Sequence, residues 1–263
     1  MISVDVVGIG AWSEFFPDWS ALQHGLNGGP WADGHKLVPE LLPATLRRRA
    51  PQTVKLAVEV MHQATSMAGL EADCVGVVFA SSMSDMQTTD RICHTLAEHP
   101  ELISPTQFHN SVHNAATGYW SIITKSHEPA NAICAHDYSP FMALLEAAIQ
   151  CADENQPMLV VSQEVETPLP FSSICANRNP CAAALLISPE GPGEDALARL
   201  QLEVIDEPAS WPDLPEPLQS RLTPSSGANL LALLAAIGST DTKPLQFPLT
   251  PHSSLRVWIT EHV

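Results

Sequence analysis

Short apolar runs, separated by segments of helical periodicity, dominate this chain. Runs of this length between polar or glycine-containing turns are typical of strands buried on both faces of a sheet. The runs cover residues 3–9, 75–80, 130–135, 158–162 and 182–187. Gly8 and Gly10 are expected to break the first strand. A last strand is predicted at 255–260, where apolar and polar positions alternate.

Helical periodicity fills most of the intervals between these runs. An apolar stripe predicts a helix from about residue 50 to residue 67, with Gly69 as its C-cap. Ser139 and Pro140 predict the N-cap and first position of another helix. Further helices are expected at 89–98, at 111–124 and at 226–237, the last ended by Gly238.

Strands that alternate with helices predict an α/β domain with a largely parallel sheet. After Pro189 the pattern changes, and residues 203–223 are rich in proline and acidic residues, as in a loop or an extended segment. We therefore divide the chain in two. Residues 1–190 form the main α/β unit, and residues 191–263 form a short Pro-rich extension with one helix and a final strand, packed on the same domain.

Composition narrows the classes of function. The 263 residues include 12 Lys and Arg against 29 Asp and Glu, a net charge of −17, with 45% hydrophobic residues. Such a chain can bury a sizeable core, and its charge argues against nucleic acid or an anionic membrane as the main partner. The longest apolar run, 230–237, is too short to span a bilayer, and the N-terminus has no basic stretch typical of a secretory signal. We expect a cytoplasmic protein.

The six cysteines are scattered and include no CxxC pair, so a zinc or iron–sulfur site is not expected. Cys74, Cys134 and Cys181 adjoin apolar runs, where free buried thiols are common. The pattern is typical of a reduced intracellular protein.

One candidate cluster surrounds the helix start at residues 104–122 (SPTQFHNSVHNAATGYWSI). His109 and His113 would share a helix face if both were helical. HxxxH can bind zinc, but the HExxH motif would need a glutamate where this chain has Asn110. The alternative is that these side chains cap the helix and pack against a partner. We expect no metal.

A second cluster lies at a strand-to-helix turn, residues 134–140 (CAHDYSP). Such a turn presents side chains at the carboxyl end of a sheet, where a nucleophile is often placed. His136 is predicted at the tip, beside Asp137, and the pair could transfer protons or hold the turn in shape. Cys134 is two residues too early for the tip and is expected to point back into the sheet.

A third polar cluster, residues 81–85 (SSMSD), follows the strand at 75–80. Neither GxGxxG nor GxxxxGK[ST] occurs there, so no glycine-rich phosphate cradle and no cofactor are expected. The segment is interpreted as a loop, with a subunit contact as a possible use.

In order and spacing, these pieces resemble the N-terminal half of a β-ketoacyl synthase of the thiolase fold. The matching segments are VVGIGAWS, VGVVFASS, SPTQFHNSVHNAATGYWSI, ANAICAHDYSPFMALLEAAI and MLVVSQEV, within about residues 1–190. The resemblance implies an α/β thiolase-like half with a buried mixed or parallel sheet and flanking helices. The C-terminal half would be largely missing, with the helix at 226–237 and the strand at 255–260 as its remnant.

The departures from this family concern the active site. With the helices in register, His136 occupies the position of the nucleophilic cysteine, Ala135 that of the preceding alanine and Cys134 that of a threonine. Imidazole cannot form the acyl thioester, so the transferase role is predicted to be lost. The histidines that the family's second half supplies also have no clear counterparts, because only His252 and His262 follow Pro189.

A ketosynthase relative that lacks the cysteine and pairs with an active one is a chain-length factor. The pattern FHNSVHNA…GYWSI most resembles the short chain-length factors of aryl polyene clusters. The resemblance implies a catalytically silent subunit that shapes the acyl tunnel, with 131–135 and 108–120 at the dimer interface. The expected interface or tunnel residues are Phe108, His113, Asn114, Tyr119, Trp120, Cys134 and His136. Tyr119 and Trp120 would be either interface anchors or core residues.

The resemblance also sets expectations for partners. A half-fold would leave a sheet face or helix layer uncovered, which an active ketosynthase would cover. Because acyl carrier proteins are acidic, a subunit at −17 should leave carrier docking to that partner. The alternatives are a stand-alone acyl-thioester enzyme, a decarboxylase or acyltransferase that uses His136 and Asp137 or Cys134, and a scaffold without influence on product length.

Overall fold

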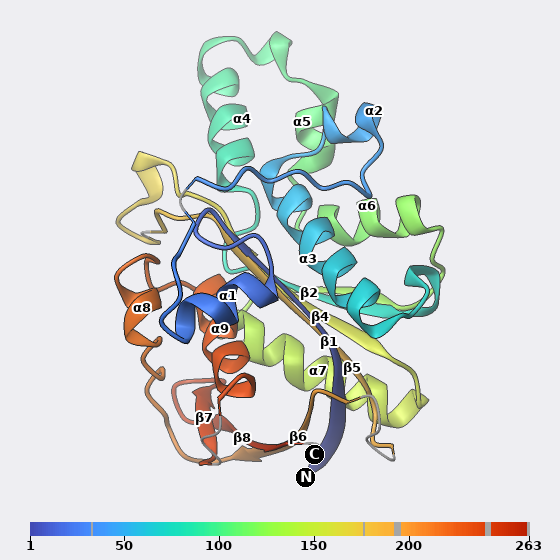
Figure 1. Ribbon diagram of the computed structural model, residues 1–263. Coiled ribbons are helices and arrows are strands. Elements are labelled where there is room, and N and C mark those ends of the chain that lie inside the picture. Colours follow the sequence, from blue (N-terminus) through green and yellow to red (C-terminus); the bar gives the residue numbers. More distant parts are fainter. Residues whose placement is uncertain (33, 176, 192–195, 240–242, 262–263) are drawn as a thin grey trace.

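The computed structural model describes residues 1–32, 34–175, 177–191, 196–239 and 243–261 (Figure 1). Within these residues a single mixed sheet has the strand order β3-β2-β4-β5-β1-β6-β8-β7. The strands are β1 (Ile2–Ser13), β2 (Gly76–Ala80), β3 (Ala130–Ile133), β4 (Met158–Glu164), β5 (Cys181–Pro189), β6 (Ala198–Ile205), β7 (Leu245–Pro248) and β8 (Ser254–Glu261). The expected mixed α/β architecture is confirmed.

Helices cover both faces of the sheet. The α-helices are α1 (Trp19–Leu26), α2 (Ala44–Arg47), α3 (Gln52–Ala68), α4 (Met86–Glu98), α5 (Pro105–Asn110), α6 (Ala115–Thr124), α7 (Ser139–Glu154), α8 (Glu216–Gln219) and α9 (Ser226–Ile237). Short 3₁₀ turns lie at Ala72–Cys74, Pro100–Leu102 and Leu169–Phe171. In the described part of the chain, no helix is both long enough and apolar enough to cross a membrane.

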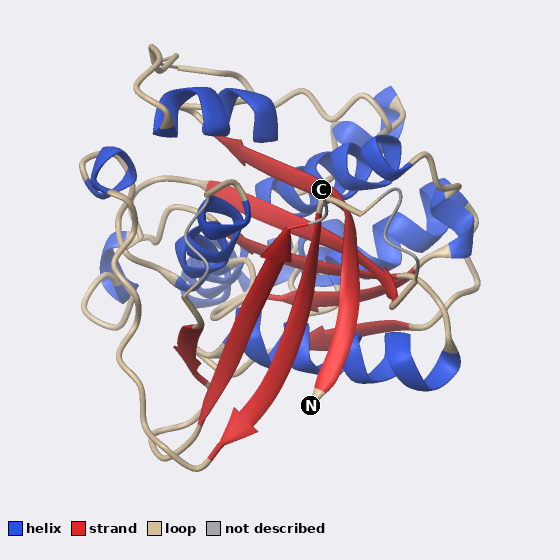
Figure 2. Cartoon of the chain, turned by 60° about the horizontal axis from the view of Figure 1, so that its bottom comes forward, coloured by secondary structure: helices blue, strands red, loops and turns tan. Residues whose placement is uncertain are grey.

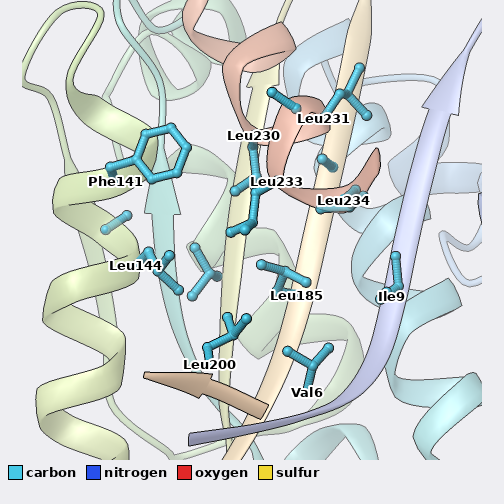
Figure 3. Close-up of a cluster of buried hydrophobic side chains, with 14 of the residues drawn as sticks. Val6, Ile9, Phe141, Leu144, Leu185, Leu200, Leu230, Leu231, Leu233 and Leu234 are labelled. Carbon is cyan, nitrogen blue, oxygen red and sulfur yellow. The ribbon is translucent and has the colours of Figure 1, made fainter. Parts of the chain in front are cut away.

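Two hydrophobic clusters, one on each face, form the core. Helices α3 and α6 pack on one face of β1, β2, β4 and β5, and α7 and α9 pack on the other (Figure 1). Figure 3 shows Leu144 of α7 and Leu233 of α9 converging on Leu185 of β5. Because consecutive strand residues point to opposite faces, strands buried on both faces must be apolar throughout, as the sequence shows.

The first strand is not broken at its glycines, contrary to the prediction. β1 runs from Ile2 to Ser13, with a register shift between Val6 and Gly8. A Cβ atom at Gly8 would lie 2.1 Å from the carbonyl oxygen of Ala64, and one at Gly10 would lie 2.0 Å from that of Val60. These glycines therefore let α3 lie directly against the strand, instead of ending it.

The sheet is mainly antiparallel, so the expectation of a largely parallel sheet is wrong. Only β2 pairs in parallel, with β3 and β4. The pairs β1–β5, β4–β5, β1–β6, β6–β8 and β7–β8 are antiparallel. Continuous apolar runs indicate burial on both faces, but they carry no information about strand direction.

The C-terminal segment contributes strands to the main sheet. Residues 203–205, predicted as a loop or an extended segment, belong to β6, which pairs with β1. β8 then pairs with β6, and β7 with β8, so the strands continue the sheet beyond β1 (Figure 2). β6 and β7 were not predicted, and only the strand at 255–260 and the helix at 226–237 were.

This segment covers one of the helix layers, that of α7. Phe247 of β7 stacks on Phe141 of α7, with ring centroids 3.8 Å apart. α9 packs against α7 and carries buried leucines at 230, 231, 233 and 234 (Figure 3). The chain's own strands and α9 therefore enclose α7, so the uncovered face or layer that was expected is not this one.

Two predicted helix ends agree with the structure because a glycine stops the helix at each. Gly69, with φ of +63°, ends α3, and Gly238 ends α9, both as predicted. The helix predicted at 111–124 begins later, as α6 at Ala115, after a turn at 111–114, and α5 before that turn was not predicted. Ser139 is the first residue of α7 rather than its N-cap, a position that Tyr138 takes.

Replacing Gly10 by alanine should destabilise the fold, because α3 would have to move away from β1. We expect a loss of about 1–3 kcal/mol in the free energy of unfolding, as for other overpacked sites. Urea unfolding followed by circular dichroism would measure it. Gly118→Ala is the matched control, since a Cβ there meets nothing within 4 Å. Equal midpoints for both variants would contradict the close approach.

Candidate functional site at the strand-to-helix elbow

A tight turn connects β3 to α7 and defines the candidate site. His136 lies at its tip with φ of 52°, a left-handed conformation that non-glycine residues seldom adopt. The Ser139 hydroxyl accepts a hydrogen bond from the Ala135 N–H at 2.9 Å and donates to the carbonyl of His136. The Tyr138 N–H also donates to the carbonyl of Ala135. The surrounding bonds thus hold the left-handed residue in place.

The tip presents an imidazole and a carboxylate to solvent. Nδ1 of His136 lies 3.3 Å from Oδ2 of Asp137, and the two side chains are 52% and 47% exposed. An exposed pair of this kind is only weakly stabilising, so it does not by itself explain the strained backbone. The arrangement can hold or transfer a proton, but the tip carries no thiol or hydroxyl nucleophile.

The thiol of Cys134 is exposed, so the expectation that it is buried in the sheet is wrong. Its Sγ donates a hydrogen bond to the carbonyl of Ser82 at 3.0 Å. The cause is that β3 is short, lies at the edge of the sheet and is itself partly exposed. A residue that follows such a strand has no neighbouring strand to cover it. Cys74 is likewise exposed, whereas Cys181 is buried as expected.

Glu164, at the end of β4, is a part of the site that the sequence reasoning missed. Its side chain is only 3% exposed. Oε1 accepts hydrogen bonds from the Ser82 N–H at 2.7 Å and from the Ser226 hydroxyl. The signal was a charged residue at the end of the strand predicted from the apolar run MLVV, since buried glutamates are rare unless partnered.

Burial raises the pKa of Glu164 to about 7, because the charged form loses its hydration. The hydrogen bonds from Ser226 and Ser82 oppose this rise in pKa. Asp137 raises the pKa further and His136 lowers it, which places Glu164 within electrostatic reach of the elbow tip. Three titratable groups thus gather at the carboxyl ends of β3 and β4.

A cavity of about 390 Å³ adjoins the elbow. Asp137 contributes to one wall, and the C-terminal segment supplies the rest, with Trp211, Leu214, Ser225 and Asn229 among its lining residues. The Trp211 ring stacks on Tyr138 with centroids 6.0 Å apart. The C-terminal segment therefore shapes the space beside the site as well as covering α7.

The loop at 81–85 connects the site to two helices. Asp85 is the N-cap of α4, where it accepts a hydrogen bond from the Thr88 N–H at 2.7 Å. Its other carboxylate oxygen accepts from the Thr53 hydroxyl, at the start of α3. Ser81 is fully buried, and its hydroxyl accepts from the Ser84 N–H. These contacts indicate a structural loop.

The histidines at 109 and 113 are not brought together on one helix face. α5 ends at Asn110, and His113 lies in the turn before α6, with its ring against Phe79 at 6.0 Å. His109 is exposed and lies 6.5 Å from Tyr119 between ring centroids. Across the described ranges, no three His, Cys, Asp or Glu side chains are grouped so that they could hold a metal ion.

Tyr119 and Trp120 belong to the core, which favours the second of the two interpretations given to them. Their exposed fractions are 7% and 1%, and both pack in the cluster beneath α3. The Tyr119 hydroxyl donates to Oδ1 of Asn110 at 3.2 Å, and the Asn110 amide donates to the carbonyl of Arg49. They cannot be surface anchors in the isolated chain.

Other apolar side chains from the same region reach the surface. Phe108 is 66% exposed and Ile122 is 67% exposed, and Leu102 and Val112 are also exposed. Asn114 is exposed nearby, while His113 is partly buried. In the described residues, the neighbouring edge strand β3 pairs only with β2, so its other edge has no strand partner.

Comparison with known proteins places this fold. A sequence model described as beta-ketoacyl synthase, N-terminal domain, matches residues 18–237. The match includes α9, so α9 belongs with that domain and is not the remnant of a second half. No curated protein matches the chain by sequence.

Solved structures share the fold at low identity. A chain of the ketosynthase ApeO in complex with its chain length factor ApeC from Xenorhabdus doucetiae aligns with a TM-score of 0.69 and 20% identity, over 98% of this chain and 100% of that one. The ishigamide ketosynthase/chain length factor aligns at 0.74 with 13% identity over 100% of both chains. AntDE:AntF, a type II PKS acyl-carrier protein in complex with its ketosynthase, aligns at 0.75 with 12% identity over 99% of both.

Replacing Glu164 by glutamine should change how stability depends on pH. The folded protein holds the Glu164 proton more tightly than the unfolded chain, because the pKa of about 7 lies above the ordinary 4.5. The contribution of Glu164 to stability is therefore present below pH 4.5 and is lost as the pH rises to about 7. The free energy of unfolding of the wild type, relative to Glu164→Gln, should fall by on the order of 3 kcal/mol over that window.

Urea unfolding of both proteins at several pH values from 4.5 to 8 tests this. A difference between wild type and variant that stays constant with pH would contradict the raised pKa.

Proposed function

This chain belongs to the family of β-ketoacyl synthase N-terminal domains, and from that premise we propose that it is a catalytically silent subunit that pairs with an active β-ketoacyl synthase. The observation that carries the proposal is the residue at the elbow. His136 holds the exposed left-handed tip, where the resemblance expects the nucleophilic cysteine. An imidazole there cannot carry the acyl chain as a thioester.

Cys134 does not replace the missing nucleophile. It lies two residues before the tip, and its thiol donates to the carbonyl of Ser82. The described part of the chain gives it no imidazole or ammonium group in hydrogen-bond contact that would generate a thiolate. Two histidines that would assist acyl condensation also find no counterpart at the elbow, where His136 has Asp137 as its ionic neighbour.

The surface supports pairing through one side of the sheet. The edge strand β3 and the exposed apolar side chains Phe108, Val112 and Ile122 lie in the segment that directly precedes the elbow. Exposed strand edges and contiguous apolar side chains are features of surfaces that another chain covers. The structures aligned above are of ketosynthases with chain length factors, and we extend that pairing to this chain as a proposal.

We assign the pair to chain-length control in aryl polyene, polyketide or fatty-acid-like biosynthesis. In this role the subunit contributes side chains to the far end of the acyl tunnel, and the partner performs the condensation. The net charge of −17 favours docking of an acidic acyl carrier protein on the partner. Residues near the elbow, His113, Cys134 and His136, are the candidates for the tunnel wall.

A second candidate function follows from the cavity beside the elbow. His136 and Asp137 form an ionic pair next to a cavity of about 390 Å³, and Glu164 lies within electrostatic reach. These groups could act as acid and base on an acyl thioester, as a decarboxylase or an acyltransferase would require. In this alternative the chain would be active without a partner.

Labelling with cerulenin, a thiol-reactive inhibitor of ketosynthases, distinguishes the two functions. In the purified pair, we expect mass spectrometry to find the label on the partner's cysteine and none on Cys134, because the tip of this elbow has no thiol. His136→Ala should leave turnover of the pair within about twofold, since the imidazole performs no chemical step. Label on Cys134, or loss of turnover in a correctly assembled His136→Ala pair, would favour the stand-alone enzyme.

Co-expression tests the pairing itself. Produced alone, the chain should be poorly soluble or self-associated, because its apolar side chains at 108, 112 and 122 remain in water. Production with the active β-ketoacyl synthase encoded nearest to it should give a soluble complex that elutes as one species in size-exclusion chromatography. A monodisperse monomer that condenses acyl thioesters by itself would contradict the proposal.

A further inference from the structure

A second cavity, of about 480 Å³, lies between α2, α5 and α6, on the face assigned to the partner. Its walls are largely apolar, with the side chains of Leu46, Val112 and Ile122 among them. The lining residues are Leu46, Arg49, Pro105, Thr106, His109, Val112, Asn114, Ala115, Gly118, Tyr119 and Ile122. Nothing in the elbow chemistry requires this space.

The charged groups of the cavity have the opposite sign to the chain as a whole. Arg49 and His109 line it, and no Asp or Glu does. Arg49 closes a run of three arginines, Arg47 to Arg49, which is a quarter of the 12 cationic side chains in a protein with a net charge of −17. Within the described ranges, the ion pairs that form involve Arg199, Arg256 and histidines, and none of the three arginines takes part. Arg49 thus brings a guanidinium to the wall of a cavity that no Asp or Glu lines, where it would complement an anion.

The phenol of Tyr119, which lines the cavity, is held by internal hydrogen bonds. The Tyr119 hydroxyl donates to Asn110, and Asn110 donates to the carbonyl of Arg49. Burial raises the pKa of Tyr119, and the hydrogen bond to Asn110 and the charge of Arg49 oppose the rise, so the guanidinium lies near the phenol. An anion that enters would therefore meet Arg49 and His109 rather than compete with internal bonds.

Gly118 gives a second, independent indication that another chain binds beside this cavity. It lies inside α6, is exposed, and lines the cavity. Its φ is not in the left-handed region, and a Cβ there would meet nothing within 4 Å. Glycine within a helix costs about 0.5–1 kcal/mol relative to alanine, so it needs a reason. The chain itself supplies none, but a segment that approaches the α6 backbone closely would.

We propose that this cavity is the socket for a carboxylate side chain of the partner subunit, carried on an apolar segment that crosses α6 at Gly118. The inference rests on the proposed function, because it assigns chemistry to the surface of that partner. The carboxylate lies between Arg49 and His109, and the apolar residues beside it fill the space between Leu46 and Ile122. Exclusion of water by the apolar walls strengthens the charge pair.

The charge requirement is tested by measuring the dissociation constant of the complex with Arg49→Gln. Loss of one member of a buried, hydrogen-bonded charge pair should weaken binding on the order of 30-fold, mainly through faster dissociation. Arg48→Gln is the matched control. It removes the same charge one residue away, from a side chain that is exposed like that of Arg49 but does not line this cavity. Its dissociation constant should stay within about threefold of the wild type.

The steric requirement is tested with Gly118→Leu. In the isolated chain this variant should unfold at the same or a higher temperature, because the leucine enters open space and leucine favours helix more than glycine. In the complex it should raise the dissociation constant about tenfold or more, because the partner segment can no longer reach the backbone. Ala152→Leu, at an exposed position near the end of α7, adds a leucine elsewhere and should change neither quantity.

The outcomes separate this inference from the proposed function. If the wild-type chain and the active β-ketoacyl synthase form no complex, the proposed function fails. If they form a complex that Arg49→Gln and Gly118→Leu leave as tight as the wild type, the proposed function stands and the socket is overturned. If these variants instead dissociate a homodimer of this chain and leave the heteromeric complex intact, the socket belongs to a second copy and the assignment to the partner is overturned.

Discussion

The buried carboxyl of Glu164 joins segments that are far apart in the sequence, and the shape of the elbow depends on them. It accepts hydrogen bonds from Ser82, after β2, and from Ser226, at the start of α9. The carbonyl of Ser82 in turn accepts from the thiol of Cys134, after β3. Glu164 therefore joins the ends of β2 and β4 to the start of α9, and the bond from Cys134 to Ser82 adds the end of β3. Burial of a charged carboxylate without hydrogen-bond partners has a high free-energy cost. The donors from Ser82 and Ser226 lower this cost, and the raised pKa lowers it further because it favours the neutral form.

The helix that meets Glu164 also determines which surfaces remain open. Gly227 of α9 lies so close to β4 that a Cβ there would be 3.1 Å from the backbone nitrogen of Glu164. Held at this distance, α9 brings its leucines over α7, and β6 to β8 complete the cover. The α7 face is largely closed by its own chain, whereas a group of exposed apolar side chains lies on α5, on α6 and in the turn between them. Pairing is therefore proposed on that side, rather than across the α7 layer.

Sequence patterns predicted this structure well where a single local cause decides the outcome. The limits of α9 follow from a continuous apolar segment between Ser225 and Gly238, and the elbow follows from a strand that runs directly into a helix. Patterns failed where the outcome depends on distant neighbours. The glycines at 8 and 10 match a strand break and a helix contact equally well, and only the position of α3 decides between them. The burial of Tyr119 and the exposure of Cys134 likewise depend on which strand lies at the edge of the sheet.

Net charge is informative at long range, and local charge decides contacts. At physiological ionic strength, exposed charges are screened beyond about 8 Å, so an approaching acidic protein first meets the average field of a chain at −17. Within that distance it meets individual groups, and Arg47 to Arg49 form a cationic patch beside an apolar cavity. A freely diffusing acidic carrier protein is therefore disfavoured, while a partner that already lies against β3 and α6 can place one carboxylate beside Arg49. The net negative charge can therefore repel an acidic carrier protein, while Arg49 binds a single carboxylate of the partner subunit.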